Sequence, residues 1–436
     1  MQAKSVHFMI KEIFQNKKKS IIFFFLTGIL VRIVYYLVTY SDSYILMPDS
    51  HSYDKISIAL LSGDFNFDRD NFIAAPLLPF LLFVLKSIFA SNWIHALIIL
   101  QIIVSSATVY YVWQLSELLF SNRRISLIVS AFYTLYPPLF YFIHSIAQET
   151  LFLFFLNAFA FYFVRYLYRS ERKDNILAAL FFTATYLTKS FISLYVPFMV
   201  LLVLLQCRQI SIPKRMVSLV QFYLIVLVLV IPVGINNYNH HKVFVTSSNG
   251  GGVVFFAANC ELNYIDLTNT PSGGTKPYEY GKAPIMTFDF FPNPTYDSIM
   301  ALPVKVKQDA FWHAGFEWIK ENPGKFLKIR VLNFVRLIIP GNSWNRYPFR
   351  LWFASFIFGL PLFLLGYTGL FLAIKENWKK HLWILAYLAS ISVMHIMFIF
   401  TNRYRTYTFD LFYGMYAAYA LDFLLTKLRK RRIANS

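Results

Sequence analysis

The sequence is dominated by apolar runs of about 20 residues, with clusters of Lys and Arg between them. A helix rises about 1.5 Å per residue, so a run of this length can cross the roughly 30 Å hydrocarbon core of a bilayer. Ten runs qualify, at residues 20–40, 94–119, 125–143, 150–168, 175–188, 191–207, 216–235, 351–374, 382–400 and 407–425. The chain is therefore predicted to be an all-α polytopic membrane protein with about ten transmembrane helices.

Composition excludes the other broad classes of protein. Only 14% of the 436 residues are charged, whereas a soluble protein carries about 25%. Two cysteines are too few for a disulfide-stapled scaffold of this size, and Cys207 and Cys260 are predicted on opposite sides of the membrane. The 41 Lys and Arg residues exceed the 22 Asp and Glu residues by 19. This excess is spread over short loops, which indicates cytoplasmic anchoring and not nucleic-acid binding.

The basic clusters predict the orientation. They lie at residues 17–19, 123–124, 165–173, 208–215, 375–380 and 427–432. With ten spans all six fall on one side, which the positive-inside rule assigns to the cytoplasm together with both termini. An eleventh apolar stretch, 76–90, has only 15 residues and two prolines at its start. Counting it as a span would place five of the six clusters outside, so we predict a helix that lies in or re-enters the membrane interface.

This topology divides the chain into three predicted parts. Residues 1–235 form an N-terminal transmembrane module, which includes a first external loop at 41–93. Residues 236–350 form a small non-cytoplasmic loop domain, and residues 351–436 hold the C-terminal spans and a basic cytoplasmic tail.

Glycine-rich stretches in the loop domain predict turns, and two patterned stretches predict helices. The turns are at 249–252 and 271–274. The helices are predicted at 304–321 and 324–339. The second mixes apolar and basic residues and suits the membrane interface; the alternative is a helix that faces water and packs on the membrane domain.

Two carboxylates stand out at the non-cytoplasmic face. Asp49 follows the first span, and Glu149 lies in the loop between spans three and four. Ionisable groups near the apolar region are costly and by default functional. Two acids at one membrane face suit an inverting displacement in which one of them takes the proton of an acceptor hydroxyl. The structural alternative is that each acid caps the start of a helix.

Basic residues on the same face form a second group. Lys189 lies at the turn between spans five and six, and Arg403 and Arg405 lie between spans nine and ten. Their position opposes the positive-inside rule, so they are predicted to hold an anion such as a lipid phosphate, with snorkelling to headgroups as the alternative. Arg32, inside span one, is expected to pair with a buried acid or a backbone carbonyl.

These residues occur within a series of motifs. The series consists of Pro48 and Asp49 followed by Tyr53, Ala59, Gly63 and Pro76 to Pro79, then Ser145 to Phe152, Leu187 to Lys189, Thr246 to Asn259 and Arg403 to Arg405. In order and spacing it resembles the GT-C-fold glycosyltransferases that use polyprenyl-phosphate sugars. That group contains the protein O-mannosyltransferases and the lipid A aminoarabinose transferase, and the resemblance covers about residues 20 to 425.

The resemblance implies roles for the two acids and for the pocket around them. Asp49 would be the catalytic base, and Glu149 would be its partner acid in the same cavity. His51, Tyr53 and His144 would line the pocket.

For the donor phosphate, the resemblance implies neutralisation by Lys189, Arg403 and Arg405. This chain departs from the family in having Ala75 where the aminoarabinose transferase has a lysine, so that role passes to Arg69 or Lys189. The family's proline-rich continuation after the arginine pair is also replaced, by residues 406–409.

The predicted function is a membrane glycosyltransferase of cell envelope glycosylation. It would move a sugar, with inversion, from a polyprenyl-phosphate carrier to a glycan, lipid or protein hydroxyl on the outer face of the cytoplasmic membrane. No cofactor, metal or nucleic acid is expected, since no cluster with ligand spacing is apparent outside. The alternatives are a lipid-linked sugar transporter or flippase, which should show internal repeats, and a surface-polysaccharide polymerase or ligase. The pair of acids favours the glycosyltransferase.

Overall fold

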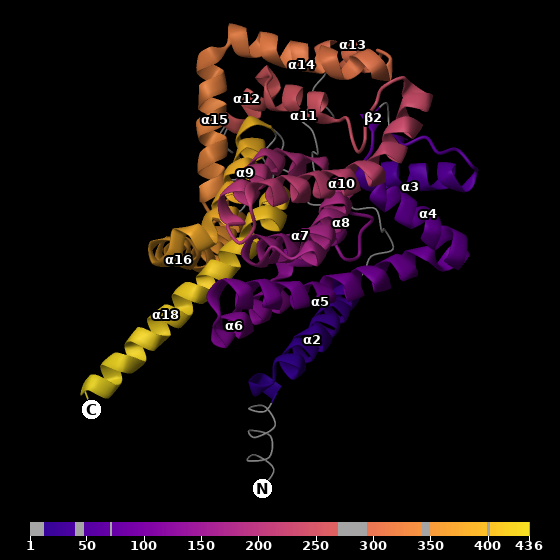
Figure 1. Cartoon of the computed structure of the whole chain (residues 1–436). Coiled ribbons are helices and arrows are strands. Elements are labelled where there is room, and N and C mark those ends of the chain that lie inside the picture. Colours follow the sequence, from indigo (N-terminus) through magenta and orange to yellow (C-terminus); the bar gives the residue numbers. More distant parts are fainter. Residues whose placement is uncertain are drawn as a thin grey trace.

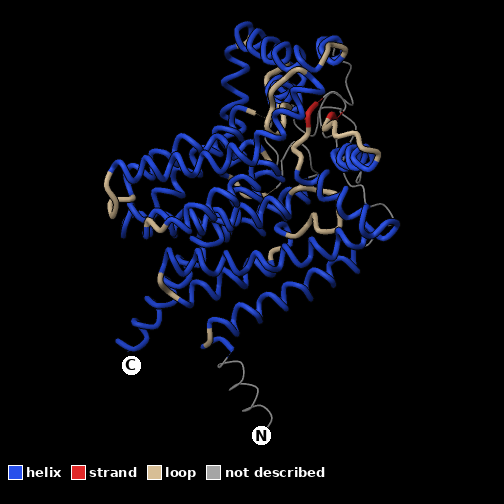
Figure 2. Tube along the Cα trace, turned by 45° about the vertical axis from the view of Figure 1, so that its right-hand side comes forward, coloured by secondary structure: helices blue, strands red, loops and turns tan. Residues whose placement is uncertain are grey.

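The computed structural model describes residues 13–39, 48–69, 72–268, 294–341, 349–398 and 402–435. Within these ranges the protein is almost entirely helical, and its strands are a two-residue antiparallel pair, β1 (Asp68–Arg69) and β2 (Phe72–Ile73) (Figure 2). The helices are α2 (Lys17–Thr39), α3 (Pro48–Leu61), α4 (Leu77–Phe89), η1 (Ala90–Asn92), α5 (Trp93–Phe120), α6 (Arg123–Leu135), η2 (Pro137–Leu139), α7 (Glu149–Arg169), α8 (Arg172–Thr188), η3 (Ser190–Tyr195), α9 (Val196–Gln206), α10 (Ile212–His241), α11 (Gly251–Ala258), α12 (Glu261–Thr268), α13 (Pro294–Met300), α14 (Val304–Glu321), α15 (Pro323–Ile338), α16 (Phe349–Met397), α17 (Asn402–Arg405), η5 (Thr406–Asp410) and α18 (Leu411–Asn435).

This architecture confirms the predicted all-α polytopic membrane protein. In the described part of the chain, five helical stretches are long and apolar enough to cross a membrane: Lys17–Thr39, Leu77–Phe120, Glu149–Arg169, Ile212–His241 and Trp352–Met397. The other predicted spans also fall on helices, but α8 has only 17 residues and α9 only 11. The count of ten spans stays a prediction.

The third predicted span, 125–143, is longer than the helix that forms there. α6 has 13 residues, or about 20 Å of helix, and Tyr136 after it is extended, with φ −83° and ψ 103°. The reason is local: Pro137 disfavours a helical conformation in the residue before it and cannot donate a hydrogen bond within a helix.

Two long helical stretches bend where the sequence predicted a boundary. The spans predicted at 351–374 and 382–400 are the two arms of α16, whose backbone is non-helical at Asn377. The predicted short helix at 76–90 is α4, and the chain turns at Ala90 (φ 44°) before α5 begins. Whether α4 lies in the membrane interface stays a prediction.

α7 is the central helix of the bundle. Of its apolar window, 78% is buried, compared with 17–28% in the other four candidate spans. It packs against α5 and α8, and its rings, such as Phe152 and Phe159, lie in the main hydrophobic core. Glu149 is the first residue of α7 and is therefore fixed at the end of the most enclosed helix.

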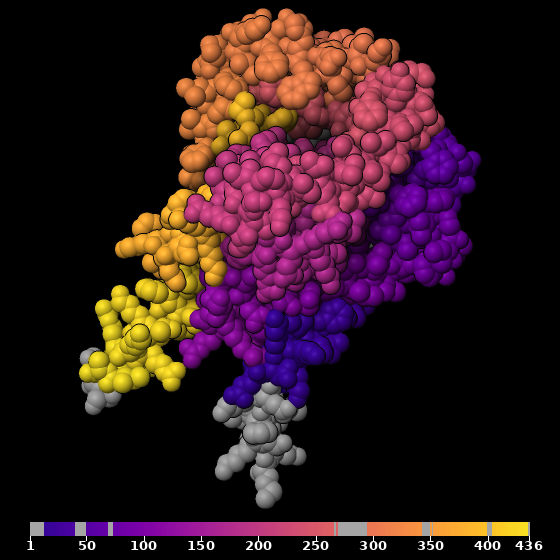
Figure 3. Space-filling model, in the orientation of Figure 1, coloured from indigo at the N-terminus to yellow at the C-terminus, as the bar shows by residue number. Residues whose placement is uncertain are grey.

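The helices α11 to α15 lie together at one end of the bundle, where α15 also packs against α16; they are called here the α11–α15 unit (Figure 1). In the space-filling view the unit overhangs the bundle, with a hollow between the two (Figure 3). α14 and α15 confirm the helices predicted at 304–321 and 324–339. The division of the chain into three parts stays a prediction.

The glycine-rich segment 249–252 is only partly the turn that the sequence predicted, because α11 begins at Gly251. Close packing against α14 explains the glycine that follows. A Cβ atom on Gly252 would lie 2.5 Å from the carbonyl oxygen of Gln308. The other predicted turn, 271–274, lies outside the described residues.

Candidate functional site

Four of the predicted residues meet in one cluster. Oε1 of Glu149 lies 2.5 Å from Nε of Arg403 and 3.0 Å from Nζ of Lys189. Oδ2 of Asp49 lies 3.5 Å from Nη1 of the same Arg403. The two acids therefore contact a single guanidinium, although they come from separate stretches of the chain. The cluster thus sets two carboxylates against two basic side chains.

Glu149 owes its position to the start of α7. Its side chain is fully buried, which would be prohibitively costly without its two cationic partners. The helix N-terminus adds a favourable partial positive charge. The dipole placement considered from the sequence thus coexists with the ion pairs, whereas the side chain at the N-cap, Gln148, makes no capping hydrogen bond.

Asp49 is brought beside Glu149 by two hydrogen bonds that the sequence did not reveal. Ser50, fully buried, donates from Oγ to the carbonyl of Ile146 at 2.9 Å. Gln101 of α5 donates from Nε2 to the carbonyl of Ser145 at 2.9 Å. The first bond holds the start of α3 against the loop that precedes α7, and the second holds the same loop against α5.

The cations are supported by main-chain geometry and by aromatic rings. Lys189 directly follows α8 in an extended conformation, which turns the chain into η3. Its Nζ lies 4.9 Å from the ring centre of Tyr404, and Cζ of Arg403 lies 5.1 Å from that of Phe142. Rings at these distances attract cations through their negative faces.

A narrow recess adjoins the cluster. It is lined by Glu149, Phe152, Lys189, Phe191, Tyr404, Tyr407 and Thr408, and it is too narrow to admit a water molecule. The side chains around the cluster would have to move apart before a ligand could enter here.

The other residues predicted to line the pocket lie in differing surroundings. His51 is exposed on α3, and Tyr53 is buried in the core packed around α3, α4 and α5. The ring of His144 lies 5.6 Å from that of Tyr35, and burial lowers the pKa of this histidine. The side chain of Arg69 lies outside the described part of the chain.

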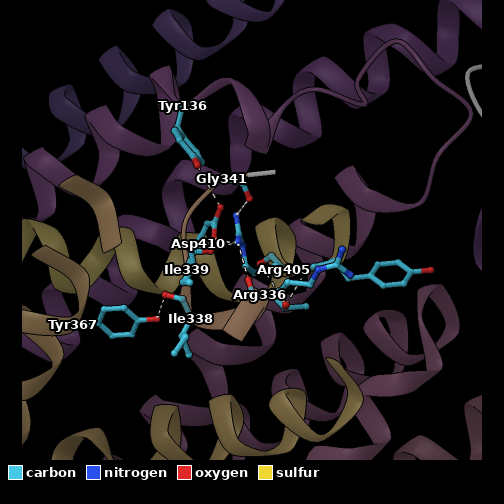
Figure 4. A network of polar contacts seen from close by, with 10 residues as sticks. Tyr136, Arg336, Ile338, Ile339, Gly341, Tyr367, Arg405 and Asp410 are labelled. Carbon is cyan, nitrogen blue, oxygen red and sulfur yellow. Dashed lines mark hydrogen bonds and ion pairs between the residues drawn. The ribbon is translucent and has the colours of Figure 1, made fainter. Parts of the chain in front are cut away.

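Arg405 does not join the cluster. Its guanidinium donates to the carbonyls of Ile339 at 2.8 Å and Gly341 at 3.2 Å, beyond the end of α15 (Figure 4). Its Nε lies 3.6 Å from Oδ1 of Asp410. Arg403 and Arg405 are thus close in the sequence but lie in two different environments in the structure.

Arg32 has a backbone carbonyl as a partner, which was one of the two possibilities predicted from the sequence. It is fully buried and donates from Nη1 to the carbonyl of Gly28 at 3.2 Å, and from Nε to Oγ of Ser105 at 2.7 Å. Cys207 and Cys260 are free thiols. Among the described residues there is no group of three or more His, Cys, Asp or Glu side chains that could hold a metal ion.

Fold and site together define a helical membrane protein with a charged cluster at the start of its central helix, and comparison with known proteins shows what it resembles. Residues 74–235 match the family model of dolichyl-phosphate-mannose-protein mannosyltransferase. This segment includes Glu149 and Lys189 but neither Asp49 nor Arg403. No curated protein sequence matches the chain significantly.

Solved structures also resemble the chain. Among them is the archaeal oligosaccharyltransferase AglB from Archaeoglobus fulgidus, in complex with an inhibitory peptide and a dolichol-phosphate. The TM-score is 0.51 and the sequence identity 14%, over 96% of this chain and 52% of AglB. The chain thus spans about half the length of AglB, and the likeness concerns the fold. The family match and this fold confirm the resemblance to GT-C membrane glycosyltransferases.

Proposed function

We propose that the protein is a membrane glycosyltransferase that moves a sugar from a polyprenyl-phosphate carrier to an acceptor hydroxyl, with inversion. The observation that carries this proposal is the contact of Asp49 and Glu149 with the same guanidinium, that of Arg403. The site is proposed to open on the non-cytoplasmic side of the cytoplasmic membrane, as the distribution of basic loops predicts.

Asp49 is proposed as the general base. Its side chain is 19% exposed, whereas that of Glu149 is fully buried, so Asp49 is the acid that an acceptor can reach. The acceptor hydroxyl gives its proton to Asp49 as its oxygen bonds to the anomeric carbon. The bond from that carbon to the phosphate oxygen breaks, and the phosphate leaves with the electron pair. Attack opposite the leaving group inverts the anomeric centre.

Glu149 is proposed to organise the cations. It contacts both Arg403 and Lys189 through Oε1, and this shared oxygen holds the two positive groups close together. Lys189 and Arg403 then stabilise the charge on the leaving phosphate. Donors that are already in position when charge develops give the largest electrostatic benefit.

Sugar transfer by the purified protein in lipid nanodiscs tests the proposal. The donor is a radiolabelled polyprenyl-phosphate sugar, and the acceptors are a hydroxyl peptide, a glycan and a glycolipid. Asp49→Asn should slow transfer by about 10²–10⁴-fold while the donor still binds. Lys189→Ala should weaken donor binding more than it slows chemistry.

The matched control is Asp64→Asn. Asp64 lies just beyond α3 in the same segment, is exposed, and accepts a hydrogen bond from the backbone of Asn66 that an amide can replace. This variant should transfer sugar at the wild-type rate. Unchanged turnover in Asp49→Asn would remove the base assignment, and translocation of the donor without transfer would favour a flippase.

A further inference from the structure

Arg403 lies at the start of a long helical stretch. It belongs to α17, which runs on directly through the π-helical turn η5 into α18. The first turn of such a stretch has N–H groups without intrahelical partners, and the π-helical turn interrupts the regular ladder behind it. Contacts from elsewhere in the fold therefore help to fix the guanidinium against Glu149 and Asp49.

The first of these contacts holds the chain just before α17. Arg330 of α15 donates from Nη1 to the carbonyl of Ile396 at 2.6 Å, and from Nη2 to that of Ala258 at 3.0 Å. Asn333, one turn further along α15, donates to the carbonyls of Ile396 and Phe398 at 3.3 and 3.4 Å. The end of α16 is thereby attached to the α11–α15 unit.

The second contact holds the chain at the end of α17. Here the donor is a side chain of α17, and the acceptors lie at the end of α15. Arg405 donates to the carbonyls of Arg336, Ile339 and Gly341, so it caps the C-terminal end of α15 (Figure 4). A cation at this end also complements the helix dipole. Its three nitrogens all face protein groups, and its side chain is only 6% exposed, which leaves no free face for a phosphate.

A buried acid completes the second contact. Asp410 lies at the end of the π-helical turn η5, which directly follows α17. Its Oδ1 lies 3.6 Å from Nε of Arg405, and its Oδ2 accepts a hydrogen bond from the hydroxyl of Tyr136 at 3.3 Å. Arg405 is thus tied both to α15 and to the chain just beyond α6.

We propose that Arg330 and Arg405 are positioning residues, which clamp the two flanks of α17 to α15 and so aim Arg403 at Glu149 and Asp49. Arg405 then acts through Arg403 and does not touch the donor phosphate. The catalytic part of this inference rests on the proposed function, whereas the clamp is a property of the fold. It also makes the α11–α15 unit a structural support of the candidate site.

A double-mutant cycle on sugar transfer tests the catalytic part. Arg405→Gln should lower kcat/KM by about 10–100-fold, in line with the loss of correct positioning. In an Arg403→Lys background the same substitution should lower kcat/KM by less than about threefold, because the effects of two residues that act through one another are not additive. If the two losses multiply in full, Arg405 contributes independently of Arg403 and the proposal fails.

Hydrogen–deuterium exchange of the full chain in nanodiscs tests the clamp without any catalytic readout. Arg405→Gln and Arg330→Gln should each raise exchange at least about tenfold in residues 402–410, whereas Arg403→Lys and the exposed control Arg350→Gln should not. Asn333→Ala is a milder variant that should raise the same exchange even if an arginine variant fails to fold. Unchanged exchange in Asn333→Ala and in the arginine variants that fold overturns the clamp. Absence of transfer in the wild type, with exchange raised as expected, would instead count against the proposed function alone.

Discussion

Glu149 and Arg403 form an ion pair with 2.5 Å between Oε1 and Nε, although 254 positions separate them in the sequence. The pair joins the start of the central helix α7 to the short helix α17. It is therefore a tertiary link as well as part of the candidate site, and its removal should affect stability and activity together.

The first prediction concerns Glu149→Ala. It leaves Lys189 and Arg403 without their shared carboxylate in a buried place, so the variant should lose about 3–5 kcal/mol of stability. Thermal unfolding in detergent, at matched protein and lipid concentrations, measures the loss. Glu117→Ala is the control: Glu117 pairs with Lys17 at the surface, both side chains are about 40% exposed, and its loss should cost at most about 1 kcal/mol. Equal effects in the two variants would contradict a buried link.

The second prediction concerns Ser50→Ala. Removing the hydroxyl leaves the carbonyl of Ile146 without this partner and loosens the start of α3, at a cost of about 1–2 kcal/mol. Because Asp49 precedes Ser50, turnover should fall more than donor affinity. Steady-state kinetics separate the two quantities. Ser62→Ala, an exposed serine bonded only within its own helical turn, should behave as wild type; an equal loss of turnover there would refute the role of Ser50.

A third prediction addresses the interfacial position of α15, which the structure does not test. Its exposed apolar side chains lie on one face: Leu327 at 63%, Val331 at 52%, Phe334 at 48% and Ile338 at 38%. A bimane probe on Leu327→Cys or Phe334→Cys should be quenched by brominated lipids, because such a stripe is expected to lie against acyl chains. A probe on the exposed Asp309→Cys of α14 should respond to aqueous iodide instead. Iodide quenching at Leu327→Cys would show that the stripe faces water.

The fourth prediction is a pH dependence at Cys260. Burial raises the pKa of this thiol to about 11. The folded state therefore keeps the thiol protonated where the unfolded chain would ionise, so stability should be fully present below about pH 9 and should fall as pH rises toward 11. Maleimide labelling at pH 8, mapped by mass spectrometry, should be slow at Cys260 in the folded protein and rapid after denaturation. Rapid labelling of the folded protein would contradict the burial.

Much of the helical architecture could be predicted from the sequence, because apolar run length alone requires helices in a membrane. The errors arose where a single residue overrides the pattern. Pro137 ends α6 eight residues before the predicted limit. Gly252 marks a helix packed closely on α14, not a loop.

The candidate site could be predicted only in part. Charge in an unusual place identified Asp49, Glu149, Lys189 and Arg403, and the structure brings these four together. The supporting bonds of Ser50 and Gln101 depend on the approach of distant helices, for which the sequence has no local signal. The same is true of Arg405, whose partners are main-chain carbonyls 64 to 69 positions away.

Because α7 is deeply enclosed, the Glu149 side and the Arg403 side of the site should differ in how many sequence changes they tolerate. Glu149 is anchored to a helix surrounded by other helices, so almost any change around it disturbs the bundle. Arg403 instead depends on α15, which carries an exposed face and belongs to a peripheral unit. Sequence changes on the exposed faces of the α11–α15 unit are therefore expected to be tolerated more often than changes around Glu149, and those that reach α15 should alter the Arg403 side of the site while leaving the carboxylate side unchanged.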